Sequence, residues 1–291
     1  MNTNVKYIVL MTIAMSLIWM VSAVVFMGMI ETPNWTDIDP VKLALSSGPF
    51  LLVSFLNVLV FAWFVNRTHL TGFSLAFRVF FLLFGVMFFM TQIEIILVEL
   101  PIEIPLEVVG VTAASGALAT LGVAIMAASY RRKLNPPASW GMWVDPSRNV
   151  TKLLILAAVY MVLYFVVGYY TAWQVPEFRE FYSGSTDIIP IGPHIQEVLR
   201  QNIALPVFQI VRGLMWAGIG YSAVVGLGNA KAWERFILVG LILSVGVATP
   251  LLISNEFMPA EVRGGHFFEL LLKNFIFGVL VALFFRPRSR G

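Results

Sequence analysis

The stretch PFLLVSFLNVLVFAWF, residues 49–64, carries no charged side chain and only two polar ones, Ser54 and Asn57. A run of about 20 apolar residues is long enough for a helix to cross the hydrocarbon core of a bilayer. Eight such runs lie at about 7–30, 43–65, 73–98, 104–129, 150–174, 203–227, 235–254 and 265–285. The runs are continuous rather than alternating, which indicates helices and not the strands of a spanning barrel. We therefore expect an all-α integral membrane protein with eight transmembrane helices.

The composition agrees with this prediction. Of 291 residues, 59% are hydrophobic and 12% are charged, whereas soluble domains have about 45–50% apolar and about 25% charged residues. The chain contains no cysteine, which excludes disulfides, thiolate metal sites and a cysteine nucleophile. The first apolar run continues to Ile30, longer than a signal peptide requires, so we expect an uncleaved first span.

The distribution of Lys and Arg predicts an orientation, because these residues concentrate in cytoplasmic loops. With the amino terminus inside, twelve of the 19 fall on the cytoplasmic side: Lys6, Arg67, Arg131, Arg132, Lys133, Arg148, Lys152, Lys231, Arg235, Arg286, Arg288 and Arg290. Four fall outside (Lys42, Arg179, Arg200 and Arg263), and three fall within helices (Arg78, Arg212 and Lys273). Both termini are therefore expected on the cytoplasmic side of the membrane. The membrane itself is expected to be the inner membrane of a bacterium. The bilayer, rather than nucleic acid, is the expected partner of the basic surface.

A repeated hexapeptide predicts an internal duplication. PLEVVG (105–110) and PAEVRG (259–264) both read P-x-E-V-x-G, and each is expected to begin the fourth helix of a repeat. Proline suits the first position of a helix, and the following glutamate faces the positive end of the helix dipole. Pro49 and Pro206 also begin corresponding second helices. The predicted organisation is a first four-helix repeat (1–133), a cytoplasmic linker (134–149) and a second repeat (150–291) with an extracytoplasmic segment (175–202).

Polar residues within these spans are the candidates for function, because they are costly in lipid and usually face the interior of the bundle. The third helix carries Gln92 and Glu94, and the sixth carries Gln209 and Arg212, which are three residues apart and share a face. We expect Arg212 to form an ion pair with Glu94 or Glu269, and the same guanidinium could also recognise an anionic ligand.

The eighth helix contains GGHFFELLLKNF, residues 264–275. His266, Glu269 and Lys273 lie on one stripe of it, Glu269 and Lys273 have favourable i, i+4 spacing, and Asn274 flanks them. His266 and Glu269 are weak candidates for metal ligands, because the di-metal pattern of helical bundles also needs further carboxylates from other helices. We predict a hydrogen-bonded polar cluster without a metal or cofactor, in which His266 could also relay protons.

These candidates all fall in the outer half of the predicted bundle, which therefore has a polar vestibule open to the outside. The cytoplasmic half is expected to be almost entirely apolar, except for Arg78. In the segment 175–202, Ile195, Val198 and Leu199 predict a short amphipathic helix on the outer surface. This helix is either a connector or a lid.

Three functions fit these features. We favour a transporter or permeation protein for a small solute, which could be an anion, that enters from the extracytoplasmic side. A non-catalytic subunit of a membrane complex, with a protein partner or a second copy of the chain, is the alternative. A membrane-embedded enzyme that acts on a lipid is the third. The absence of a P-loop, a Rossmann fingerprint and a nucleophile elbow leans against an enzyme.

Overall fold

The computed structural model describes residues 3–29, 40–97, 104–133, 149–228, 230–255 and 257–285. Within these ranges all regular structure is helical and there is no strand. The linker predicted at 134–149 lies, apart from Asn149, outside the described residues.

Seven long helices and one interrupted helix form the body of the protein. The long helices are α1 (Thr3–Met27), α2 (Pro40–Arg67), α5 (Leu106–Lys133), α6 (Val150–Tyr170), α9 (Leu205–Gly226), α10 (Ala232–Ala248) and α11 (Ala260–Phe284). The interrupted helix consists of α3 (Gly72–Phe84), a π-helical turn (Gly85–Phe89) and α4 (Met90–Leu97). The shorter elements are the 3₁₀ helix η3 (Ala172–Gln174), α7 (Pro176–Ser183), α8 (Ile191–Gln201) and the 3₁₀ helix η4 (Thr249–Leu252).

The predicted spans correspond to these helices, except that α2 begins at Pro40, so Pro49 lies inside this helix and does not begin it. Seven helical segments of the described chain are long and apolar enough to cross a membrane. An eighth is counted if α8 and α9, which meet at an angle of 96°, form one broken span. The architecture is that of a multi-pass helical membrane protein.

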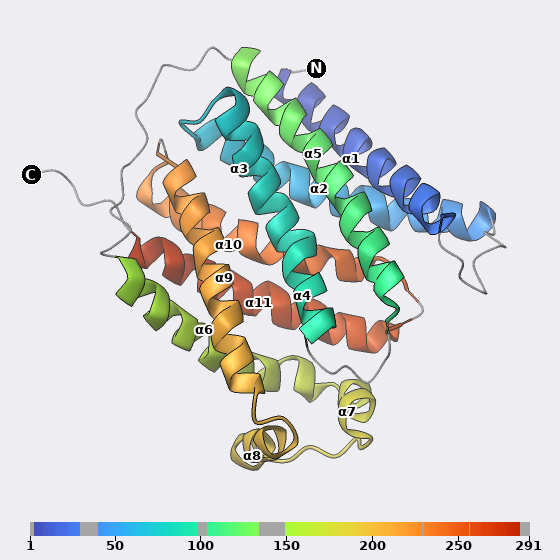
Figure 1. The fold of residues 1–291 in the computed structure, drawn as a ribbon, viewed down its shortest axis with the longest axis vertical. Helices are drawn as coiled ribbons and strands as arrows, with labels where there is room; N and C mark the ends of the chain where they lie inside the picture. Colours follow the sequence, from blue (N-terminus) through green and yellow to red (C-terminus); the bar gives the residue numbers. More distant parts are fainter. Residues whose placement is uncertain are drawn as a thin grey trace, which may run out of the picture.

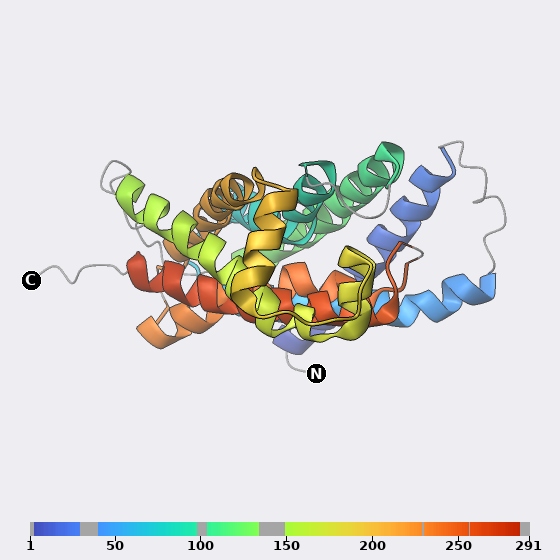
Figure 2. The ribbon, with the colours of Figure 1, turned by 90° about the horizontal axis from the view of Figure 1, so that it is seen from below.

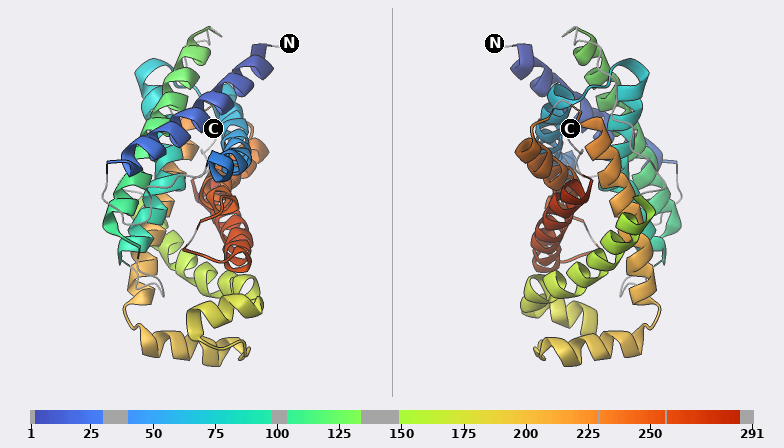
Figure 3. Two further views of the ribbon diagram at one scale, coloured as in Figure 1. Left: turned by 90° about the vertical axis from the view of Figure 1, so that its right-hand side faces the viewer. Right: turned by 90° about the vertical axis from the view of Figure 1, so that its left-hand side faces the viewer.

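The helices are arranged in two layers. In Figure 3, α1, α3 and α5 lie on one side of the molecule, and α2, α10 and α11 lie on the other. Figure 1 shows that α3, α5 and α9 cross over α10 and α11, and Figure 2 shows the same layers from below. Extensive packing joins α10 to α11, α1 to α5, α3 to α5, and α6 to α9. The polar candidates are therefore carried by helices of both layers.

The hexapeptides have the predicted role at helix starts. Helix α5 begins directly after Pro105 and α11 begins directly after Pro259. The Pro105 carbonyl accepts from the backbone N–H groups of Val108 and Val109, and the Pro259 carbonyl accepts from that of Arg263.

The connection between α6 and α9 covers one end of the molecule, at the bottom of Figure 1. Its second helix, α8, is the amphipathic helix predicted around Ile195, and none of its residues is buried. Its first helix, α7, was not predicted. Arg179 holds this helix in place, because it is buried and donates to the carbonyl oxygens of Trp173 and Thr186 at 2.7 and 2.8 Å.

The cations of the predicted cytoplasmic side lie at the opposite end of the molecule. Helices α5 and α11 end there, and α6 and α10 begin there. The prediction that this half is almost entirely apolar is wrong. Arg131, Arg235 and Glu234 are buried there, and Arg67 pairs with Glu234 at 2.6 Å.

The last carbonyl groups of a helix explain this buried polarity, since they have no partner within the helix and carry partial negative charge. Arg131 donates to the Thr68 carbonyl at the end of α2 (2.7 Å), and Lys152 donates to the Phe284 carbonyl at the end of α11 (2.8 Å). Arg78 donates to the carbonyl and hydroxyl oxygens of Ser222 within α9 (2.8 and 2.5 Å). Arg131 and Lys152 therefore neutralise the ends of α2 and α11.

The π-helical turn interrupts a span that the sequence predicts as continuous. Such turns insert one extra residue and are frequent at functional sites. Phe88 in this turn lies against Gly116 of α5, where a Cβ would be 2.4 Å from the phenylalanine ring. The extra residue changes the face that α4 presents, and α4 carries Gln92 and Glu94.

Gly213 brings α9 close to α6. A Cβ at this position would lie 2.8 Å from the Cα and carbonyl oxygen of Ala157. The absence of a side chain therefore sets the approach of α9 beside Arg212. Gly218, five residues later on the same helix, has open space instead, because a Cβ there would meet no atom within 4 Å.

We expect Gly213→Ala to lower the free energy of unfolding by about 1–3 kcal/mol, because backbone atoms of α6 must shift. Gly218→Ala is the matched control, and it should be neutral or stabilising by up to about 1 kcal/mol, since alanine favours helix. Thermal unfolding of both variants in detergent measures the difference. Equal melting temperatures for the two variants would contradict this packing of α9 on α6.

Candidate functional site

A buried ion pair joins α4 to α9. Arg212 donates from Nη1 to Glu94 Oε1 at 2.8 Å and from Nη2 to Glu94 Oε2 at 2.7 Å. This confirms one of the two ion pairs predicted for Arg212. Gln209, one turn earlier on α9, accepts a longer bond from the same guanidinium at 3.3 Å. Bidentate pairs of this kind are the strong, geometrically specific class of charged hydrogen bond.

A second set of polar groups follows one stripe of α11, as predicted. Lys273 Nζ donates to Glu269 Oε1 at 2.7 Å, and Glu269 Oε2 lies 3.2 Å from His266 Nδ1. Tyr182 of α7 completes the set, because its hydroxyl lies 2.7 Å from His266 Nε2. Four side chains thus form one continuous hydrogen-bonded chain.

Helix α6 lies between the two ion pairs. Lys273 Nζ lies 4.9 Å from the ring centroid of Tyr164 and 5.8 Å from that of Tyr160. Tyr164 lies within electrostatic range of Glu94, Glu269 and Arg212. The two pairs therefore form one cluster, to which α4, α6, α7, α9 and α11 contribute.

The exposed fraction of the side chains shows which side of the cluster is open. Arg212 and Lys273 are each 1% exposed and Glu269 is 7% exposed. His266 is 22% exposed and Glu94 is 30% exposed. The two cations thus lie at the closed side, and one carboxylate and the histidine lie toward the side covered by α7.

Some polar atoms of the cluster have no hydrogen-bond partner among the described residues. Within the described part of the chain, four of its buried donors have no hydrogen-bond partner: Gln209 Nε2, Arg212 Nε, Trp216 Nε1 and the Tyr160 hydroxyl. Gln209, Arg212 and Trp216 share one face of α9, and the Tyr160 ring lies 6.3 Å from that of Trp216. Buried polar atoms are nearly always satisfied in proteins, by protein, water or ligand. This face of α9 is therefore suited to an acceptor.

Two other candidates lie elsewhere in the bundle. Asn274 donates to the Leu270 carbonyl of its own helix at 2.9 Å. Gln92 is buried on α4. The acceptor atoms Gln92 Oε1 and Asn274 Oδ1 have no partner among the described residues. Neither residue therefore belongs to the hydrogen-bonded chains of the two ion pairs.

The hydroxyl of Tyr182 remains protonated at neutral pH. Burial raises the pKa of this phenol, and the negative charges of Glu94 and Glu269 raise it further. The phenol can donate to His266 Nε2, and in that arrangement His266 Nδ1–H donates to Glu269.

The described residues contain no group of three His, Asp or Glu side chains that could hold a metal ion. The weak metal candidates His266 and Glu269 instead contact Tyr182, Lys273 and each other. The candidates thus form a hydrogen-bonded network.

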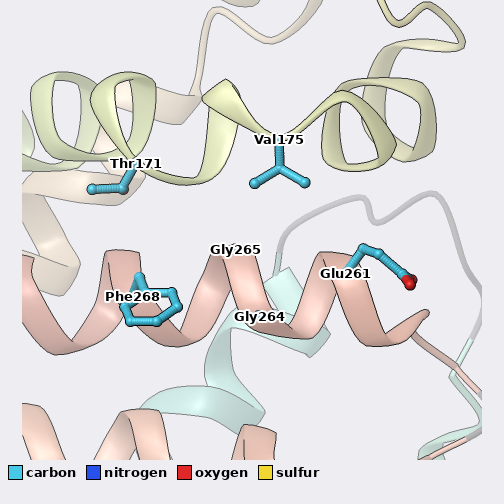
Figure 4. A pocket seen from close by; sticks show the side chains of 6 residues that line it. All are labelled: Thr171, Val175, Glu261, Gly264, Gly265 and Phe268. Atoms are coloured by element: carbon cyan, nitrogen blue, oxygen red, sulfur yellow. The ribbon is translucent and has the colours of Figure 1, made fainter.

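A groove of about 480 Å³ lies beside the cluster, between the end of α6 and the start of α11 (Figure 4). Thr171 and Val175 line one wall, and Glu261, Gly264, Gly265 and Phe268 line the other. Its lining does not include His266, Glu269 or Lys273, which point from a different stripe of α11. The groove is therefore separate from the charge cluster.

The sequence did not single out Tyr160, Tyr164, Trp216 or Tyr182 as site residues. Tyr160 and Tyr164 have i, i+4 spacing in an apolar span, which is a signal that a polar face reaches the interior. Tyr182 belongs to α7, and no local pattern predicts that α7 folds against α11.

The fold and the site define a multi-pass helical membrane protein with a charge-balanced cluster inside its bundle. Comparison of the chain with protein-family models, with curated proteins and with solved structures found no match. Function is therefore inferred from the chemistry of the cluster.

We expect Glu94→Gln to destabilise the protein by about 3 kcal/mol, because it leaves Arg212 buried without a counter-charge. Arg212→Met should cost less, since the Glu94 carboxylate is 30% exposed and can reach water. The double variant should resemble Arg212→Met. Thermal unfolding of the three variants in detergent gives the comparison, and a larger loss for Arg212→Met than for Glu94→Gln would contradict this geometry.

Proposed function

We propose that the chain is a transporter or permeation protein for a small anionic solute. It lies in a bacterial inner membrane, and both of its termini are on the cytoplasmic side. The observation that carries the proposal is the buried Arg212. It is paired across the bundle with Glu94 and lies beside donors that have no partner among the described residues.

Stability alone does not account for this cluster. A buried ion pair is often no more stabilising than apolar side chains of the same volume, because taking the charges out of water is costly. Charged residues inside spans usually mark a pathway for substrate or ions. The cluster has four buried or half-buried charges and four donors without a partner among the described residues. These features favour a pathway for a solute over a non-catalytic subunit in which the cluster only holds the helices together.

The chemistry of α9 supports an anion. Gln209, Arg212 and Trp216 offer N–H groups along one face, and Tyr160 adds a hydroxyl from α6. Arg212 already binds a carboxylate, that of Glu94, in a bidentate arrangement. A solute with acceptor atoms and negative charge can use the same donors.

The position of Arg212 in the bundle also supports transport. In the first half of the chain α1 packs on α2 and α5, and α3 packs on α5. In the second half α6 packs on α9 and α11, and α10 packs on α11. This correspondence supports the proposed duplication, with halves at 1–133 and 150–291. Arg212 and Glu94 come from different halves, and transport sites commonly lie at the interface between repeats.

The test is anion flux into liposomes that contain the purified protein. Chloride, nitrate, phosphate and radiolabelled lactate are the probes, and protein-free liposomes give the background. We expect at least one probe to enter faster with the protein present. Arg212→Gln should lower this flux at least tenfold, because the positive charge at the site is lost.

Arg200→Gln is the matched control, since Arg200 lies on α8 with its side chain 80% exposed. Its flux should equal that of the natural chain. Background flux for all four probes, or full flux through a folded Arg212→Gln variant, would overturn the proposal.

A further inference from the structure

The chain from Tyr182 through His266 and Glu269 to Lys273 runs from the half-exposed side of the cluster to its buried side. The three links are 2.7, 3.2 and 2.7 Å long. Along it the side chains become less exposed, from 22% at His266 to 7% at Glu269 and 1% at Lys273. A continuous series of polar hydrogens and lone pairs in this direction is a path for protons.

We propose that protons enter the cluster through Tyr182, His266 and Glu269, and that one proton accompanies each monovalent anion bound at Arg212. The second part rests on the proposed function, whereas the proton path stands on the geometry of α7 and α11. The ligand assigned to this path is the proton, and the transported solute is then moved without net charge.

Each transfer along the path is balanced. Tyr182 passes its hydroxyl proton to His266 Nε2 and takes one from solvent. The imidazolium then releases the Nδ1 proton to Glu269 Oε2, so the phenol is restored and the imidazole is left as its Nε2–H tautomer, which must return to the Nδ1–H form before the next proton passes. The result is one added proton on Glu269, which removes the negative charge that had neutralised Lys273.

The charge count of the cluster explains the coupling. Arg212 and Lys273 contribute two positive charges, and Glu94 and Glu269 contribute two negative charges, so the two ion pairs balance each other. An anion that enters alone would leave one uncompensated negative charge in a low-dielectric site, which is unfavourable. A proton on Glu269 restores neutrality, and it also frees the Lys273 ammonium to interact with the anion.

Among the described residues, helix α11 and four elements facing it carry the titratable and charged groups along the path. Helix α11 provides His266, Glu269 and Lys273. The facing elements provide Tyr182 (α7), Tyr160 and Tyr164 (α6), Arg212 (α9) and Glu94 (α4). His266 and Glu269 are the proton acceptors within the hydrogen-bonded chain, whereas the carboxylate of Glu94 is engaged by Arg212.

The first experiment measures proton and anion movement in the same liposomes. A trapped pH-sensitive dye reports protons, and the anion is chloride, nitrate or lactate, whichever the natural chain transports. We expect about one proton to enter per anion and an acidic exterior to accelerate uptake. In His266→Gln the uptake should lose its dependence on the pH gradient.

Tyr182→Phe tests the entry step with a variant of nearly unchanged shape, and it should slow proton entry several-fold. Tyr170→Phe is its control, because Tyr170 is 63% exposed and lies outside the path. Two results for the natural chain would overturn proton coupling: anion uptake without proton entry, or an uptake rate that does not depend on the pH gradient. Neither result would contradict the proposal of anion transport.

A second experiment tests the path when no anion is moved. The chain has three histidines, so ¹⁵N-histidine NMR in detergent can assign His266 by comparison with His266→Gln. We expect the Nδ1–H tautomer with Nε2 as a hydrogen-bond acceptor, and a shift of the Nε2 signal in Tyr182→Phe but not in Tyr170→Phe. If the Nε2 chemical shift of His266 is the same in Tyr182→Phe as in the natural chain, the proton path itself is overturned.

Discussion

No water is available in the hydrocarbon core of a bilayer, so every polar group placed there must find a partner inside the protein. This constraint explains why the backbone is helical throughout the described spans. It also explains the two polar regions of the bundle. At the basic end, cations bind the last carbonyl groups of α2 and α11, and Arg67 pairs with Glu234. At the other end, charges bind each other.

The two regions differ in what their charged groups contact. At the basic end Arg131 and Lys152 bind backbone carbonyls at helix ends and Arg67 binds the carboxylate of Glu234. In the cluster around Arg212 the charges balance, but donors on α9 and α6 remain without partners among the described residues.

The helix α7 links the cluster to the surface of the protein. It is held by Arg179, and it contributes Tyr182 to the chain of hydrogen bonds along α11. Phe178 of the same helix packs against His266 with ring centroids 4.7 Å apart. Movement of α7 would therefore change the contacts of His266 first. The connection between α6 and α9 thus packs directly against the histidine of the cluster.

The amino-acid sequence alone predicts the helical class, the approximate limits of the spans and the stripe of His266, Glu269 and Lys273, because length, apolarity and helical spacing are local properties. It also narrows the partner of Arg212 to two carboxylates, since few anions lie in the spans. It does not predict the π-helical turn before Glu94, the docking of α7, or the buried cations at the basic end. These features depend on contacts between residues far apart in the chain. Glu94 lies 118 positions from Arg212 and Tyr182 lies 84 positions from His266, and only packing of the helices brings such groups within hydrogen-bonding distance.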